Sequence, residues 1–167
     1  MGKELTEKDI ELMRQELYHR RFELRPKLIE AVKEARAFGD LSENFEYKAA
    51  KQEKNRNDSR CRYLENVIRT ATIISDKSQE GTVGLYDKVT LYVEDDEEEM
   101  VIQIVTTMRQ DALKGLVSKE SPVGRAVLGR RVGDRVTVQV NDNYGYDVII
   151  RAIEPCEDNG EAPLVSF

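Results

Sequence analysis

The chain has 167 residues, of which 35% are charged and 40% hydrophobic, and it contains no Trp. This length suits one ordinary domain or two small ones. No apolar run approaches the roughly 20 residues that span a bilayer, and the N-terminus lacks the apolar core of a secretory signal. We therefore expect a cytoplasmic protein with no membrane partner. A single His and two distant Cys argue against a catalytic triad, a zinc site or a disulfide framework.

The formal net charge of −6 is distributed unevenly along the chain. Residues 1–75 hold 16 basic and 14 acidic side chains, a net charge of +2, and the remainder carries −8. The two parts also differ in their hydrophobic pattern. This asymmetry predicts two units with different surroundings.

Residues 6–36 predict one long helical arm. The stretch has no Gly, and its apolar residues recur three, four or seven positions apart, at Ile10, Met13, Leu17, Leu24, Leu28, Val32 and Ala35. Thr6 is a suitable N-cap, with Asp9 in the first turn. Because Pro26 removes a backbone donor inside this arm, we expect a bend near residues 22–26 rather than a break.

The segment FGDLSE, residues 38–43, predicts a tight turn into a second helix. Gly39 is a typical residue for ending a helix, Asp40 can cap the next one, and Glu43 follows three residues later, as in a capping box. The second helix is expected from about residue 41 to 71, with Lys54 and Asn57 interrupting its apolar seam. Each arm has about 30 residues, so the hairpin would be on the order of 45 Å long.

After residue 84 the pattern changes to short runs rich in β-branched residues. Strands are expected over residues 88–93, 100–106, 135–140 and 146–153. Ser121 followed by Pro122 predicts a short helix that stops at Gly129. Residues 157–163 are expected to form a loosely ordered tail.

These patterns together predict an α+β chain. An N-terminal antiparallel two-helix coiled-coil hairpin would occupy residues 1–75, with its tip near residues 39–44. A polar linker would follow over residues 76–84. A globular domain, an antiparallel β-sheet with a short helix, would occupy residues 85–167.

Asp40 and Glu43 have two interpretations on local physics alone. As N-cap and N3 residues they would satisfy amide donors at the start of a helix and stabilise it by roughly 1 kcal/mol. As two carboxylates at the far end of a thin rod, they would be hard oxygen ligands suited to Mg²⁺. The interpretations are compatible, because a capping Asp can still expose one oxygen.

Two sequence blocks resemble a known family. The block ARAFGDLSENFEY, residues 35–47, is similar to the hairpin-tip signature of the GreA/GreB transcript cleavage factors. The block SPVGRAVLGRRVGD, residues 121–134, is similar to the C-terminal signature of the same family. The resemblance is GreA-like, and it implies a coiled-coil hairpin joined to an FKBP-like domain that docks on RNA polymerase.

The resemblance also implies a mechanism. The globular domain would dock at the rim of the polymerase secondary channel, and the hairpin would pass down it to the active site. There Asp40 and Glu43 would serve as catalytic and metal-binding residues, helping the polymerase to hold Mg²⁺ and to cleave the extruded 3′ RNA of a backtracked complex. The chain would not itself be an enzyme, and it would have no cofactor of its own beyond the shared Mg²⁺.

Residues 48–69 form a basic stretch with seven basic and three acidic side chains, a net charge of +4. One interpretation is a solvated helix face. The other is a strip that faces the extruded RNA, where phosphate attraction gives affinity without sequence readout. The family resemblance supports a basic RNA-facing patch, and Lys51, Lys54 and Arg56 are the candidate RNA-binding residues.

Other residues of the tip have less distinct roles. Ser42, Asn44, Glu46 and Tyr47 are candidates for contacts with polymerase or RNA, although the position of Tyr47 on the apolar face favours a packing role. Phe45 departs from the small residue that the family typically has at this position.

Two alternative functions follow from the same sequence. A protein of the same shape could occupy the secondary channel and inhibit transcription without promoting cleavage, but the presence of both Asp40 and Glu43 favours a cleavage factor. The FKBP-like expectation also suggests a prolyl isomerase or chaperone. Fold alone does not give function, and the chain has no Trp to floor a proline pocket.

Overall fold

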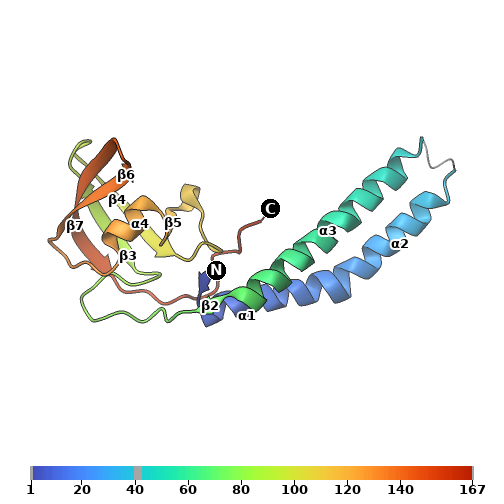
Figure 1. Cartoon of the computed structure of the whole chain (residues 1–167), viewed down its shortest axis with the longest axis horizontal. Coiled ribbons are helices and arrows are strands. Elements are labelled where there is room, and N and C mark those ends of the chain that lie inside the picture. Colours follow the sequence, from blue (N-terminus) through green and yellow to red (C-terminus); the bar gives the residue numbers. More distant parts are fainter. Residues whose placement is uncertain (1, 40–42, 167) are drawn as a thin grey trace. The chain divides into compact units, whose positions relative to one another are not determined.

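Figure 1 shows the computed structural model of the chain, which describes residues 2–39 and 43–166. The chain forms two compact units. The first consists mainly of Ile10–Ala71, and the second combines Glu4–Asp9 with Thr72–Ser166. Within the described residues, every helix is too short or too polar to cross a bilayer.

The first unit is a hairpin of two antiparallel helical arms (Figure 1). The first arm runs through α1 (Glu7–Tyr18), the π-helical segment η1 (His19–Leu24) and α2 (Arg25–Arg36), and the second arm is α3 (Phe45–Thr70). The predicted helical hairpin is therefore confirmed. The apolar seam between the arms is narrow, and its buried residues are Ile10, Met13, Leu28, Ala35, Cys61, Leu64 and Val67.

The chain stays helical through Pro26, which lies in the first turn of α2. A proline has no N–H to donate, and its ring crowds the preceding helical turn. The segment η1 accommodates this constraint, because the backbone N–H of Arg25 donates to the carbonyl of Arg20, five residues earlier. The irregularity predicted near residues 22–26 thus takes the form of a widened helical turn over His19–Leu24.

The second arm begins at Phe45, not near residue 41 as the capping pattern predicted. Its N-cap is Asn44, whose Oδ1 accepts a hydrogen bond of 3.0 Å from the backbone N–H of Tyr47. The Nδ2 of Asn44 donates to the carbonyl oxygen of Ala35 at 2.6 Å. A single side chain therefore starts α3 and ties it to the last turn of α2.

The cap at Asn44 corrects the capping-box interpretation of the tip acids. Glu43 precedes the N-cap, so it does not occupy the N3 position of α3, and Asp40 lies outside the described residues. Asn is as good an N-cap as Asp, and Asn44 gains the additional bond to Ala35. Glu43 is exposed.

The second unit is built on a five-stranded sheet with the order β5-β4-β3-β7-β6. Its strands are β3 (Lys88–Val93), β4 (Glu98–Val105), β5 (Leu116–Ser118), β6 (Arg135–Asn141) and β7 (Tyr144–Glu154). Neighbouring strands are antiparallel except for the parallel pair β4 and β5. The four predicted strands are confirmed with small shifts at their ends, and β5 was not predicted.

Four short elements complete the second unit. Helix α4 (Pro122–Val127) follows its predicted cap, Ser121, whose hydroxyl accepts a hydrogen bond from the N–H of Gly124 at 3.1 Å. The 3-10 turn η2 (Ala112–Lys114) precedes β5. Strands β1 (Glu4–Leu5) and β2 (Thr72–Ile73) form a separate parallel pair.

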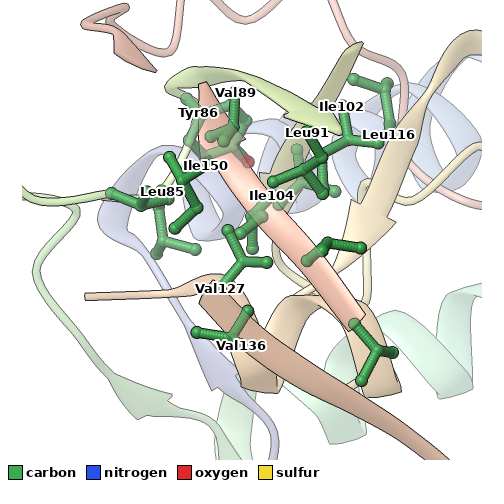
Figure 2. Packing of buried hydrophobic residues seen from close by; sticks show 14 of the residues in the cluster. Leu85, Tyr86, Val89, Leu91, Ile102, Ile104, Leu116, Val127, Val136 and Ile150 are labelled. Atoms are coloured by element: carbon green, nitrogen blue, oxygen red, sulfur yellow. The ribbon is translucent and has the colours of Figure 1, made fainter. Parts of the chain in front are cut away.

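The core of the second unit lies between the sheet and α4, and Figure 2 shows its packing. Val89, Leu91 and Val93 of β3 are buried at alternate positions, as one face of a strand requires. Val127 of α4 packs into the same cluster. Val83, from the segment predicted to be a linker over residues 76–84, is also buried in this cluster.

A buried ionic cluster around Arg109 joins three distant parts of the second unit. The guanidinium donates two hydrogen bonds, of 2.7 and 2.8 Å, to the carboxylate of Asp158, and one of 3.1 Å to Asp9. The Nε of Arg109 donates to the carbonyl of Ala162 at 2.6 Å. These contacts hold the C-terminal tail, so the prediction of a loosely ordered segment over residues 157–163 is wrong.

The electrostatics of this cluster predict a pH-dependent stability. Burial acts to raise the pKa of Asp158, but the hydrogen bonds and charge of Arg109 and the amide of Gly160 outweigh it and hold this pKa below its usual range. A carboxylate with a lowered pKa in the folded state stabilises the fold above its unfolded pKa of about 4. That contribution is lost as the pH falls through the lower, folded pKa.

We therefore expect Asp158→Asn to lower the free energy of unfolding of the second unit by about 2 kcal/mol near neutral pH. The difference from the unchanged protein should shrink as the pH falls below about 4. Urea unfolding followed by amide hydrogen exchange in the sheet measures this quantity. Glu161→Gln, which alters an exposed carboxylate of the same tail, is the matched control and should have no effect. A difference that stays constant into acid would contradict the charged-pair explanation.

Candidate functional site at the hairpin tip

The tip is the end of the first unit at which the chain passes from α2 to α3. Gly39 has a φ of 128°, a backbone conformation that favours glycine. Apart from its chain neighbours, no atom of the described residues lies within 4 Å of where a Cβ would stand. Asn44 fixes the opposite side of the tip through its bond to Ala35. Glu43 lies exposed between these two anchors, next to the segment that contains Asp40.

Tyr47 braces the hairpin behind the tip. Its hydroxyl accepts a hydrogen bond of 3.2 Å from Nη2 of Arg36, on the opposite arm. The Arg36 guanidinium lies 5.3 Å from the ring centroid, and the Lys51 ammonium lies 5.9 Å from it. The ring and the hydroxyl are thus engaged within the hairpin, as expected for a packing residue.

A basic surface, here called the outer face of α3, runs along the second arm from the tip. Six residues line an open hollow of about 560 Å³ on it: Lys48, Lys51, Gln52, Asn55, Arg56 and Ser59. Three of them are basic and none is acidic. Two of the three candidate RNA-binding residues, Lys51 and Arg56, therefore share one surface, together with Lys48. Lys48 lies four, seven and eight positions before Gln52, Asn55 and Arg56, which is the spacing of one helical face. Helical spacing from Arg56 would therefore have identified Lys48 and left Lys54 out.

Lys54, the remaining candidate, lies apart from this face. It is half-buried, and its Nζ donates to Oδ2 of Asp58 at 3.0 Å. The Nε of Arg25, on the other arm, donates to Oδ1 of the same carboxylate at 2.9 Å. Because its charge is balanced in a contact between the arms, we assign Lys54 to the stability of the hairpin rather than to the basic surface.

The seam between the arms is polar at its middle. Arg60 is only 2% exposed and donates to both carboxylate oxygens of Glu16, at 2.8 and 3.3 Å. Asn57 accepts a bond from Nη1 of Arg20 and donates to the Arg20 carbonyl, both at 3.0 Å. Burial acts to raise the pKa of Glu16, but Arg60 and Arg20 outweigh it and lower this pKa. These specific partners fix the register of the two arms.

The described residues include no group of three or more His, Cys, Asp or Glu placed to hold a metal ion. Glu43 offers an exposed carboxylate, which is the type of ligand that Mg²⁺ prefers. Asp40 would add a second carboxylate, from outside the described part of the chain.

Comparison with known proteins gives matches over both units. The family model described as transcription elongation factor, N-terminal, matches residues 3–73. The model described as transcription elongation factor, GreA/GreB, C-term, matches residues 78–155. The two matches follow one another in the order in which the hairpin and the sheet occur in the chain.

Individual relatives agree with the family models. Transcription elongation factor GreA of Geobacillus kaustophilus is 44% identical over 136 residues, which are 81% of this chain and 86% of that protein. The Staphylococcus carnosus protein of the same name is 37% identical over 150 residues, 90% of this chain and 94% of its own. A solved structure of the transcription factor Gfh1 is 28% identical, covers 92% of this chain and 97% of its own, and has a TM-score of 0.45. The chain belongs to the GreA/GreB family of transcription elongation factors.

Proposed function

We propose that this elongation factor inserts its hairpin into the secondary channel of RNA polymerase and stimulates cleavage of the 3′ RNA in backtracked, arrested complexes. The catalyst is the polymerase, and the factor contributes side chains in trans. The site of action is the bacterial cytoplasm, with no membrane partner.

The position of Glu43 is the observation that carries this proposal. The structural alternative for the tip acids was a capping role, and Asn44 fills the N-cap position of α3. Glu43 is exposed next to Asp40 in the sequence and is not needed at N3 of that helix. A carboxylate held at the end of a hairpin without a capping function suits a role toward a partner.

The length and width of the hairpin suit a role in which its tip carries side chains into a partner. Helix α3 has 26 residues, which corresponds to about 39 Å at 1.5 Å per residue. Each arm is one helical segment wide, so the hairpin is narrow enough to enter a channel that would exclude a globular domain. The narrow shape leaves little room for an active site of its own, which favours chemistry shared with a partner.

The chemistry proposed for the tip is assistance to hydrolysis. Mg²⁺ shared with the polymerase active site would stabilise the attacking and leaving oxygens of the phosphodiester. Asp40 and Glu43 would offer carboxylate oxygens as ligands to this ion. The same oxygens would accept a hydrogen bond from the attacking water and orient it.

The test is RNA cleavage in a purified backtracked elongation complex. Replacing both tip acids, as Asp40→Asn/Glu43→Gln, should reduce stimulated cleavage by about 100-fold or more, because amides keep the size of the carboxylates but not their charge. Affinity for polymerase should remain unchanged. Glu53→Gln, which neutralises an exposed acid further along α3, is the matched control and should retain cleavage.

Three results would contradict the proposal in different ways. Undiminished cleavage by the double variant would mean that the tip acids are not the working groups. Loss of polymerase binding would assign them a structural role. A parent protein that binds polymerase and slows elongation without cleavage would instead be a secondary-channel inhibitor.

The outer face of α3 gives a second prediction. Lys51→Glu/Arg56→Glu should weaken the action of the factor about tenfold on complexes with long extruded RNA, and much less on complexes with a short extruded end, because only the longer RNA would reach this face. The slope of log activity against log salt concentration should also become less steep by about one to two, because fewer counterions are released when the variant binds RNA. Lys27→Glu/Lys33→Glu places the same charge change on exposed positions of α2 and is the matched control. Equal losses on long and short RNA would contradict an RNA-facing role.

A further inference from the structure

Phe45 presents an aromatic ring to solvent beside the hairpin tip. It is the first residue of α3, two positions after Glu43, and it is 79% exposed. A single exposed apolar side chain is ordinary on a protein surface. The surroundings of this ring, rather than its exposure alone, indicate a use.

The ring of Phe45 is not required to close the tip. Asn44 caps α3 and bonds to Ala35. Tyr47 packs between the arms and is held by Arg36. The two residues that flank Phe45 along this short segment therefore provide the local stability, and the side chain of Phe45 is left on the outside.

A basic side chain lies against the ring of Phe45, which is also close in sequence to the exposed acids Glu43 and Glu46. The ammonium of Lys48, one helical turn further on, lies 5.5 Å from the centroid of the Phe45 ring. Lys48 is also the first residue of the outer face of α3, whose lining contains basic and neutral polar side chains and no acid. The aromatic ring thus lies at the tip end of a basic surface.

We propose that Phe45 is a stacking platform for an unpaired nucleobase of the extruded RNA. This inference rests on the proposed function and adds to it a contact that charge alone does not supply. Proteins that bind single-stranded nucleic acid combine a basic groove with aromatic rings on which bases stack, and every base offers a flat face for this contact. Lys48 would hold a phosphate next to the stacked base.

The role of Phe45 is to position the RNA, not to react with it. A base stacked on the ring would hold the extruded strand next to the tip acids and limit its motion. The contact would not depend on the identity of the base, since it uses no hydrogen bonds to the base edge. An apolar pocket on polymerase is the competing destination for the ring, and the Lys48 ammonium beside the ring, at the tip end of the outer face of α3, favours RNA.

The test combines a protein substitution with a chemical change in the RNA. On a complex with long extruded RNA, Phe45→Ala should raise the factor concentration needed for half-maximal cleavage about tenfold, and Phe45→Trp should restore it. Phe38→Ala, which removes a ring that is 73% exposed on the other side of the tip, is the matched control and should have little effect. A set of RNAs, each with one abasic residue in the extruded segment, then identifies the stacked base.

On the RNA that lacks the stacked base, the parent protein and Phe45→Ala should reach half-maximal cleavage at equal factor concentrations. A Phe45→Ala loss of the same size on every abasic RNA would assign the ring to a contact with polymerase and overturn the inference. An unchanged Phe45→Ala variant would overturn it as well. In both cases the parent protein still cleaves, so the proposed function survives.

A second readout does not depend on cleavage. In the Asp40→Asn/Glu43→Gln background the RNA stays intact, and 5-iodouridine placed at the same RNA position should cross-link to Phe45 on irradiation. Absence of this cross-link, with polymerase bound, would overturn the stacking proposal. Absence of stimulated cleavage by the parent protein together with a Phe45 cross-link would overturn the proposed function and leave the RNA contact standing.

Discussion

The hairpin depends on the ion pair between the buried Arg60 of one arm and the half-buried Glu16 of the other. Two helices packed side by side bury a narrow apolar seam, and such a seam holds the arms together without strongly fixing how they slide. Arg60 opposes this sliding, because a shift of register would break its two hydrogen bonds to the Glu16 carboxylate. Asn57 adds two hydrogen bonds to Arg20 that only one register permits.

Register matters because the functional groups lie at the far end of the hairpin. A sliding arm would move the tip turn and change which residues form it. The bond from Asn44 to Ala35 closes the end of the hairpin in the register that the Arg60 pair sets. The result is a fixed position for Glu43 and for the ring of Phe45. The polar residues reduce the apolar contact between the arms, but they restrict the arms to one register.

The parts of the structure that were predicted well are those with a repeating pattern. The apolar positions from Ile10 to Ala35 and the alternation in β3 follow from helix and strand geometry, so they can be read from neighbouring residues. Strands β1, β2 and β5 have two or three residues each and exist through their pairing partners, which no local pattern contains. The ordered tail was missed for the same reason: Asp158 is held by Arg109, which lies 49 positions earlier and is not part of any local pattern.

The candidate site was predicted by residue type better than by position. The capping pattern placed the start of α3 near Asp40, whereas the N-cap is Asn44, which also makes a contact across the tip to Ala35. Lys54 was assigned to the basic strip because its charge resembles that of Lys51. Helical geometry turns each residue by about 100° from the last, and this turn places Lys54 toward Asp58 instead of on the outer face.

The measurement that tests the central claim most directly is the Mg²⁺ dependence of RNA cleavage in a backtracked complex. The rate is measured as a function of Mg²⁺ concentration without the factor, with the factor, and with Asp40→Asn/Glu43→Gln. If the tip carboxylates supply ligands, the parent factor lowers the Mg²⁺ concentration for half-maximal cleavage by about tenfold or more, and the double variant restores the value seen without the factor. A half-maximal concentration that is the same in all three reactions would contradict a role for the tip acids at the metal.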